Sequence, residues 1–174
     1  MAGGINLYSY AGNNPVSFSD PFGLCADSLH DANGRCPGGL TAREFDRAEY
    51  AARNHLTPRA GRRVLRLLYG GRIHSAALPD RKANGETLSN GEITLNTQSR
   101  NGNLFESHPA FLAYVLAHES AHNAQTTGWQ GVLTSVKFLI SPEATRQALE
   151  DEAYSFGCAN STSLVIKRNP SCHR

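Results

Sequence analysis

Two histidines and a glutamate stand close together in the middle of the chain, in the run His118-Glu119-Ser120-Ala121-His122. Histidines four residues apart on a helix project from the same face, so their imidazoles can share one metal ion. Glu119 is turned about a quarter-circle away and is free to act on metal-bound water. Zinc lowers the pKa of such a water to about 7, and a carboxylate beside it can accept the proton as hydroxide attacks a carbonyl. The run therefore predicts a catalytic Zn²⁺ held by His118 and His122, with Glu119 as the general base.

The residues before this run predict a helix that carries it. Ser107 can cap such a helix, Pro109 suits its first turn, and an apolar stretch over 111–117 leads directly into His118. A structural pair of histidines, hydrogen-bonded and without metal, is the alternative interpretation.

A catalytic zinc also needs a third protein ligand and an open position for water. A later helix, predicted from Ser141-Pro142 to about Phe156 and ended by Gly157, supplies the candidates Glu150, Glu152 and Glu143. Only one of these three glutamates should face the metal.

The spacing on this later helix resembles that of the gluzincin metallopeptidases. In that family a second helix presents a Glu, a small residue three positions later and usually an Asp four positions later. The resemblance implies that Glu150 is the third ligand and Ala153 the small residue that lets the helices pack closely. Tyr154 stands where the family has the Asp that orients a zinc histidine. A tyrosine there can hydrogen-bond a developing oxyanion, as a catalytic residue, or can simply pack.

The first 24 residues differ in composition from the rest. They include Gly-Asn-Asn-Pro at 12–15 and end in Asp-Pro-Phe-Gly-Leu at 20–24. This segment resembles the end of the Rhs/YD-repeat core, whose C-terminal domain is released by autoproteolysis just after the motif. The resemblance implies that 1–24 is the tail of a parent Rhs core and that 25–174 is a toxin domain. It also implies secretion and delivery into a neighbouring or host cell, and a cognate immunity protein that neutralises the toxin.

The bulk composition limits the remaining possibilities. The chain has 174 residues, 40% of them hydrophobic and 18% charged, with a formal net charge of +2. This is the size and composition of one globular domain, and the charge is too small to indicate a nucleic-acid partner. No apolar run approaches the roughly 20 residues that span a bilayer, and we expect the chain to carry no export signal of its own.

Local patterns predict three further elements. The capping box at 41–44 (Thr-Ala-Arg-Glu) predicts a helix over 42–55, and Pro58 begins a second helix that the glycines at 70–71 end. Residues 79–90 are polar and rich in turn formers, and the alternation over 92–96 predicts a short strand.

Together these patterns predict an α+β fold, mostly helical, with a short β-sheet ahead of the active helix. The motifs resemble those of a small zincin-like metallopeptidase domain. An extended peptide substrate is expected to lie alongside the strand near Ile93.

The four cysteines form two pairs that are close in sequence, Cys25 with Cys36 and Cys158 with Cys172. Two short-loop disulfides and four free thiols are both compatible with this spacing.

Two other function classes compete with the peptidase. The helix after Pro58 carries arginines along one side, at Arg59, Arg62, Arg63 and Arg66. A nucleic-acid-directed toxin would use this stripe, although no aromatic residue for base stacking interleaves with it in sequence. A non-catalytic binding module would keep the fold while its metal position was empty or closed.

Overall fold

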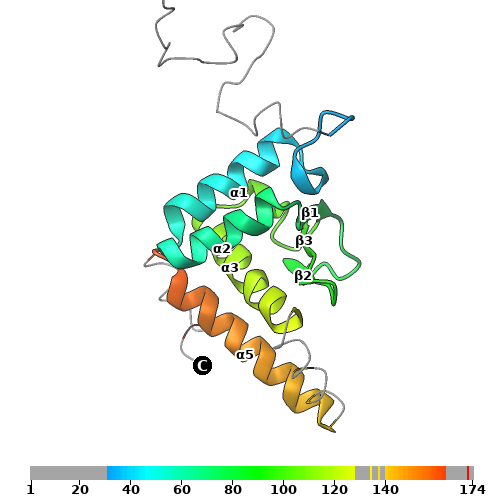
Figure 1. Cartoon of the computed structure of the whole chain (residues 1–174), viewed down its shortest axis with the longest axis vertical. Coiled ribbons are helices and arrows are strands. Elements are labelled where there is room, and N and C mark those ends of the chain that lie inside the picture. The colour runs from blue at the N-terminus through cyan, green and yellow to red at the C-terminus, as the bar shows by residue number, and fades with distance from the viewer. Residues whose placement is uncertain (1–30, 128–133, 135–136, 138–139, 164–171, 173–174) are drawn as a thin grey trace, which may run out of the picture.

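A computed structural model describes residues 31–127, 134, 137, 140–163 and 172. In this part of the chain four helices lie to one side of a small sheet (Figure 1). The helices are α1 (Ala42–His55), α2 (Pro58–Tyr69), α3 (Pro109–Thr126) and α5 (Pro142–Asn160), and the strands are β1 (Ile73–Ala76), β2 (Gly85–Thr87) and β3 (Ile93–Asn96). Two short 3-10 turns, η3 (Pro37–Gly39) and η4 (Leu104–Glu106), complete the fold. The prediction of a mostly helical α+β fold is confirmed.

The two N-terminal helices begin and end where the sequence predicts. Thr41 caps α1 in a reciprocal capping box with Glu44, and Pro58 occupies the first turn of α2. The two helices cross closely because Gly61 has no side chain. A Cβ there would lie 2.6 Å from the carbonyl oxygen of Ala52. Helix α3 packs against both of these helices.

The sheet has the strand order β1-β3-β2, with β1 parallel and β2 antiparallel to β3. The strand predicted over 92–96 is β3, but it is the central strand and both of its edges are paired. The expected peptide-binding position alongside Ile93 is therefore wrong, and the strand with an outer edge next to α3 is β2. Neither β1 nor β2 was predicted from the sequence; β2 is only three residues long and lies in the polar stretch 79–90.

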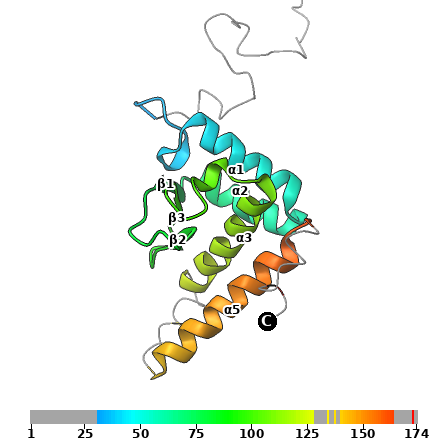
Figure 2. The same ribbon diagram turned by 180° about the vertical axis from the view of Figure 1, so that it is seen from behind.

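Helix α3 runs through the centre of the molecule, between the sheet and α5 (Figures 1 and 2). Its first half is fully buried at Leu112, Ala113, Leu116 and Ala117, which join a single hydrophobic core with α1, α2 and β3. The run from His118 to His122 begins immediately after this apolar half. The core thus holds the helix rigidly just before the residues that carry chemistry.

Two predicted helix boundaries are wrong. Ser107 ends η4 and donates its hydroxyl to the carbonyl of Leu104, so the residue that caps α3 is His108, whose Nδ1 accepts from the Ala110 N–H. Gly157 does not end α5, which continues to Asn160. A glycine ends a helix through a left-handed conformation, and Gly157 instead lies inside the helix.

One predicted cysteine pair forms a disulfide, between Cys158 in the last turn of α5 and Cys172. Cys36 is also disulfide-bonded, whereas Cys25 and the whole segment 1–24 lie outside the described residues. Among the helices of the described residues, none has the length and apolar character needed to cross a membrane.

Candidate metal centre

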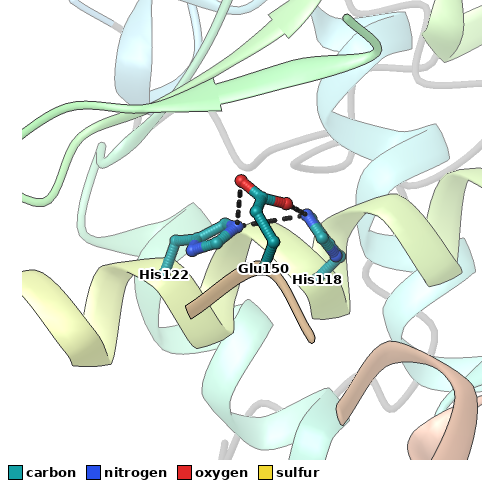
Figure 3. Close-up of side chains that lie close together, drawn as sticks. All are labelled: His118, His122 and Glu150. Atoms are coloured by element: carbon teal, nitrogen blue, oxygen red, sulfur yellow. Dashed lines mark hydrogen bonds and ion pairs between the residues drawn. The ribbon is translucent and has the colours of Figure 1, made fainter. Parts of the chain in front are cut away.

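Three side chains from two helices converge beside the sheet (Figure 3). His118 and His122 come from α3, and Glu150 reaches across from α5. The two imidazole Nε2 atoms lie 3.2 Å apart. One carboxylate oxygen of Glu150 lies 3.6 Å from the Nε2 of His118, and the other lies 3.5 Å from the Nε2 of His122. The predicted ligand set is therefore brought together.

The spacing of these atoms suits a small divalent ion. Donors bound tetrahedrally to zinc at about 2.0–2.1 Å stand about 3.3–3.4 Å from one another. The two imidazole nitrogens are 3.2 Å apart, close to that value, and each has its own Glu150 oxygen within 3.6 Å. One donor atom from each of the three residues lies within 4.8 Å of the other two. Imidazole nitrogen and carboxylate oxygen are also donors that zinc accepts. Three protein donors leave a fourth position open for water or substrate, as a catalytic site requires.

Glu119 is turned toward the sheet and is 5% exposed. Its carboxylate Oε2 accepts a hydrogen bond of 2.7 Å from the hydroxyl of Thr87, on β2. Burial raises the pKa of Glu119, and the bond from Thr87 lowers it by a smaller amount. A carboxylate with a raised pKa is a stronger base than an exposed one, which suits it to accept a proton from water.

The outer strand lies directly over this glutamate. A Cβ at Gly85 would stand 2.9 Å from the Glu119 Oε1, so any larger residue would displace the carboxylate. Sequence analysis did not identify Gly85 or Thr87, because neither residue belongs to a local motif. Only the pairing of β2 with β3 brings them to Glu119.

The two histidines differ in how their second nitrogen is held. The Nδ1 of His122 lies 2.8 Å from the side-chain oxygen of Gln125, one helical turn later. The buried Nδ1 of His118 has no well-formed hydrogen bond among the described residues. The His118 ring packs instead against the ring of Tyr154, with centroids 4.6 Å apart.

These surroundings separate the proton affinities of the two rings. The pKa of His118 falls to about 4: burial is the main cause and the charge of His122 adds to it, while Glu150 and a hydrogen bond with the Ala153 backbone offset only part of the shift. Burial also lowers the pKa of His122, but the hydrogen bond with Glu150 and the charge of Glu119 outweigh it and raise the value overall. The hydrogen bond with His122 in turn lowers the pKa of Glu150. His118 is therefore neutral at pH 7 and offers a lone pair to a metal.

The side chains lie in a cleft of about 410 Å³ between β2, α3 and α5. Its wall includes the three candidate ligands, Glu119 and Tyr154, together with the segment 82–87 that ends in β2.

The two alternative third ligands do not join the site. Glu152 accepts a hydrogen bond of 3.0 Å from the side-chain amide of Gln125. Glu143 is exposed in the first turn of α5. Of the three glutamates proposed from the sequence, Glu150 alone lies with both histidines in the described residues.

The arginine stripe forms a separate hollow on α2. Arg59, Arg62, Arg63 and Arg66 line about 380 Å³ together with Phe156 from α5. The guanidinium of Arg63 lies 5.4 Å from the centre of the Phe156 ring. The structure thus supplies an aromatic neighbour that the sequence did not place there, but Arg63 covers one face of it.

Comparison of the chain with protein-family models, with curated proteins and with solved structures finds no match. Any functional conclusion therefore depends on the geometry of the cleft and on the sequence itself.

Proposed function

We propose that this chain is a zinc-dependent peptidase with a zincin-like active site. The observation that carries the proposal is the convergence of donors from His118, His122 and Glu150 within 4.8 Å of one another, next to a buried glutamate in the same cleft. An accidental pair of histidines would need no acid from a distant helix. The resemblance to gluzincins in sequence points to the same three ligands.

The residues of the chain have separate roles in the proposed reaction. Bound zinc would polarise the scissile carbonyl and lower the pKa of a water molecule. Glu119 accepts the proton of that water and passes it to the leaving amine. Thr87 holds one carboxylate oxygen of Glu119, which leaves the other free for this transfer. Tyr154, the tyrosine predicted to be catalytic, lies on the wall of the cleft and packs on His118.

The outer edge of β2 is where an extended peptide would bind. Asn84 accepts a backbone hydrogen bond from Asn96, and Leu88 donates one to Glu92, so both point toward β3. Alternation in an antiparallel pair then directs the main-chain groups of Gly85 outward, together with those of Thr87 two residues later. An added strand would pair with these groups and lie along the cleft. Folded proteins, unfolded proteins and stem peptides of a cell wall all present the amides that such a site would cleave.

We propose further that the peptidase is the toxin domain of an Rhs-type protein, delivered into a neighbouring or host cell. The support is the sequence of residues 1–24, which resembles the tail of the Rhs core. A cognate immunity protein in the producing cell follows from the same resemblance.

The decisive experiment compares the native chain with Glu119→Gln and with Glu143→Gln, a matched control on the exposed first turn of α5. Zinc content, hydrolysis of casein and toxicity on induction are measured for each. We expect Glu119→Gln to keep its zinc while hydrolysis falls about 10²- to 10⁴-fold, the usual contribution of a general base. The control should match the native chain in all three.

Two other outcomes would replace the proposal. If toxicity survives Glu119→Gln but disappears on reversal of Arg59 and Arg66 to glutamate, the chain acts on nucleic acid, and its binding should weaken steeply with salt. If zinc binds stoichiometrically but no protein or peptide is cleaved, the domain is a non-catalytic binding module.

A further inference from the structure

The side-chain amide of Gln125 lies between a candidate metal ligand on α3 and the helix that supplies the third ligand. Its oxygen faces the Nδ1 of His122 at 2.8 Å. Its nitrogen faces the carboxylate of Glu152 at 3.0 Å and the main-chain carbonyl of Leu149 at 3.2 Å. Gln125 is 5% exposed, so water does not replace these partners easily.

The chemistry of the three partners fixes the orientation of this amide. A carbonyl accepts hydrogen bonds and cannot donate them, and an ionised carboxylate has the same limitation. The amide must therefore turn its NH₂ group toward Leu149 and Glu152. Its oxygen, which can only accept, is left facing His122.

The orientation of the amide in turn fixes the tautomer of the histidine. An oxygen acceptor 2.8 Å from the Nδ1 of His122 requires a hydrogen on that nitrogen. In the neutral ring the Nε2 then carries a lone pair, and this is the atom that faces the Nε2 of His118 and the Glu150 carboxylate. A metal ligand needs this tautomer.

We infer that Gln125 and Glu152 are positioning residues that hold His122 ready to bind a metal. The inference rests on the proposed metal site. Glu152 acts through Gln125, and Gln125 acts through His122, so neither residue touches the ion or the substrate. Because Glu152 lies two residues after Glu150 on α5, the same helix supplies one ligand directly and orients another through the amide.

The test uses the full chain, first without metal. The side-chain nitrogens of His122 are observed by ¹⁵N NMR at a pH where the ring is neutral, which reports the tautomer directly. Zinc affinity is then measured by competition with a chromophoric chelator. Thermal unfolding of the metal-free variants separates loss of positioning from loss of the fold.

Two variants and one control make the test specific. Gln125→Leu removes the amide. Gln147→Leu removes a similar bond, of 2.8 Å to Asp151, on the exposed side of α5. The exchange Gln125→Glu with Glu152→Gln rebuilds the bonds from His122 to residue 125 and between residues 125 and 152, because the new carboxylate accepts from His122 and from the new amide. The Leu149 carbonyl loses its donor in this pair, as it does in Gln125→Leu.

We expect the native chain and Gln147→Leu to show His122 protonated on Nδ1. Gln125→Leu should give a mixture of both neutral tautomers and bind zinc about 10- to 100-fold more weakly, as is typical for loss of an outer hydrogen-bond partner. The exchanged pair should recover the Nδ1–H tautomer and most of the affinity.

The inference is overturned if Gln125→Leu leaves both the tautomer and the zinc affinity of the native chain unchanged. It is also overturned if the exchanged pair unfolds at the native temperature but shows the tautomers and zinc affinity of Gln125→Leu, since the contact would then be only a link between helices. A native chain with the Nδ1–H tautomer but without zinc affinity would refute the proposed metal site alone.

Discussion

The two histidines of the candidate metal centre lie one helical turn apart and are held in opposite ways. His122 is fixed by a polar chain through Gln125 to Glu152. His118 is fixed by packing, between the ring of Tyr154 and the ring of His122, and its buried Nδ1 makes no well-formed hydrogen bond among the described residues. One ligand is thus oriented by hydrogen bonds and the other by shape.

This difference should affect the stability of the fold mainly at His118. Burial of a polar atom without a hydrogen bond destabilises a fold by about 1–3 kcal/mol. His118 carries part of this cost, because its ring has only a weak interaction with the Ala153 backbone, and burial is the main reason that its pKa falls to about 4. His122 does not, since Gln125 satisfies its Nδ1. The His118 half of the site is therefore less stabilising than the His122 half, and its neutral ring keeps a lone pair for a metal at pH 7.

The largest predicted effect comes from replacing each histidine with leucine. Both His118→Leu and His122→Leu should lower zinc affinity by more than about 100-fold, which exceeds the effect of losing an outer partner. Without metal the two should diverge. His118→Leu replaces an imidazole whose buried Nδ1 has only a weak partner in the Ala153 backbone, so it should lower the unfolding free energy less than His122→Leu does.

In contrast, His122→Leu leaves the oxygen of Gln125 buried without a donor and should lower the unfolding free energy by about 1–3 kcal/mol. Urea denaturation of the metal-free proteins measures both changes. Equal destabilisation by the two substitutions would show that the histidines are held alike.

The second prediction concerns the packing that supports His118. A Cβ at Gly157 would lie 3.1 Å from the ring of Tyr114, and that ring contacts His118 with centroids 6.4 Å apart. Gly157→Val should lower the unfolding free energy by about 1–3 kcal/mol, the usual cost of overpacking.

The control for this substitution is Ala148→Val, which adds a β-branched residue at an exposed position of the same helix. It should cost less than about 1 kcal/mol, because only helix propensity changes. Thermal unfolding gives both values. If the two variants are equally destabilised, close packing at Gly157 is not what holds α5 against α3.

Most of the helical framework could be predicted from local sequence, for reasons that the structure makes clear. The capping box at Thr41 and the proline at position 58 act within one turn, so they have the same effect in any tertiary context. The ligand histidines share one helix face for the same reason. Glu150 was placed by a family resemblance in spacing, and the structure brings it to both histidines.

What the sequence could not supply depends on contacts between distant residues. The strand β2 is three residues long and exists because β3 pairs with it, so Thr87 could not be linked to Glu119 in advance. The sequence suggested that Gly157 ends a helix. In the structure it lies inside α5, where the missing side chain lets the ring of Tyr114 pack closely. Gln125 could have been noticed three residues after His122, but its role requires Glu152 from α5.

A smaller effect is predicted at Glu119, the buried glutamate that lies between the two histidines in the sequence. Because burial raises its pKa, ionisation of this carboxylate opposes folding. The penalty is absent below the pKa of the unfolded chain and is fully present above the pKa of the folded one. Glu119→Gln should therefore raise the unfolding free energy of the metal-free protein near pH 7 by about 0.5–2 kcal/mol, a typical gain for one stabilising substitution.

The amide keeps an oxygen that can accept from Thr87, so the gain should shrink steadily as the pH is lowered. Unfolding curves between pH 4 and pH 8, with Glu143→Gln as the exposed control, provide the measurement. A stabilisation that does not depend on pH would mean that the pKa of Glu119 is the same in the folded and the unfolded chain.

The smallest effect is expected at Tyr154, where hydroxyl and ring can be separated. If shape alone holds His118, Tyr154→Phe keeps the ring contact of 4.6 Å and should change zinc affinity by less than about threefold, whereas Tyr154→Ala should weaken it by about tenfold. The hydroxyl is tested by kcat. A hydrogen-bond donor to the oxyanion contributes about 10²- to 10³-fold, so a loss of that size in Tyr154→Phe, with zinc retained, would assign it to catalysis. An unchanged kcat would assign Tyr154 to the packing of His118. His118 would then be held by packing and His122 by hydrogen bonds.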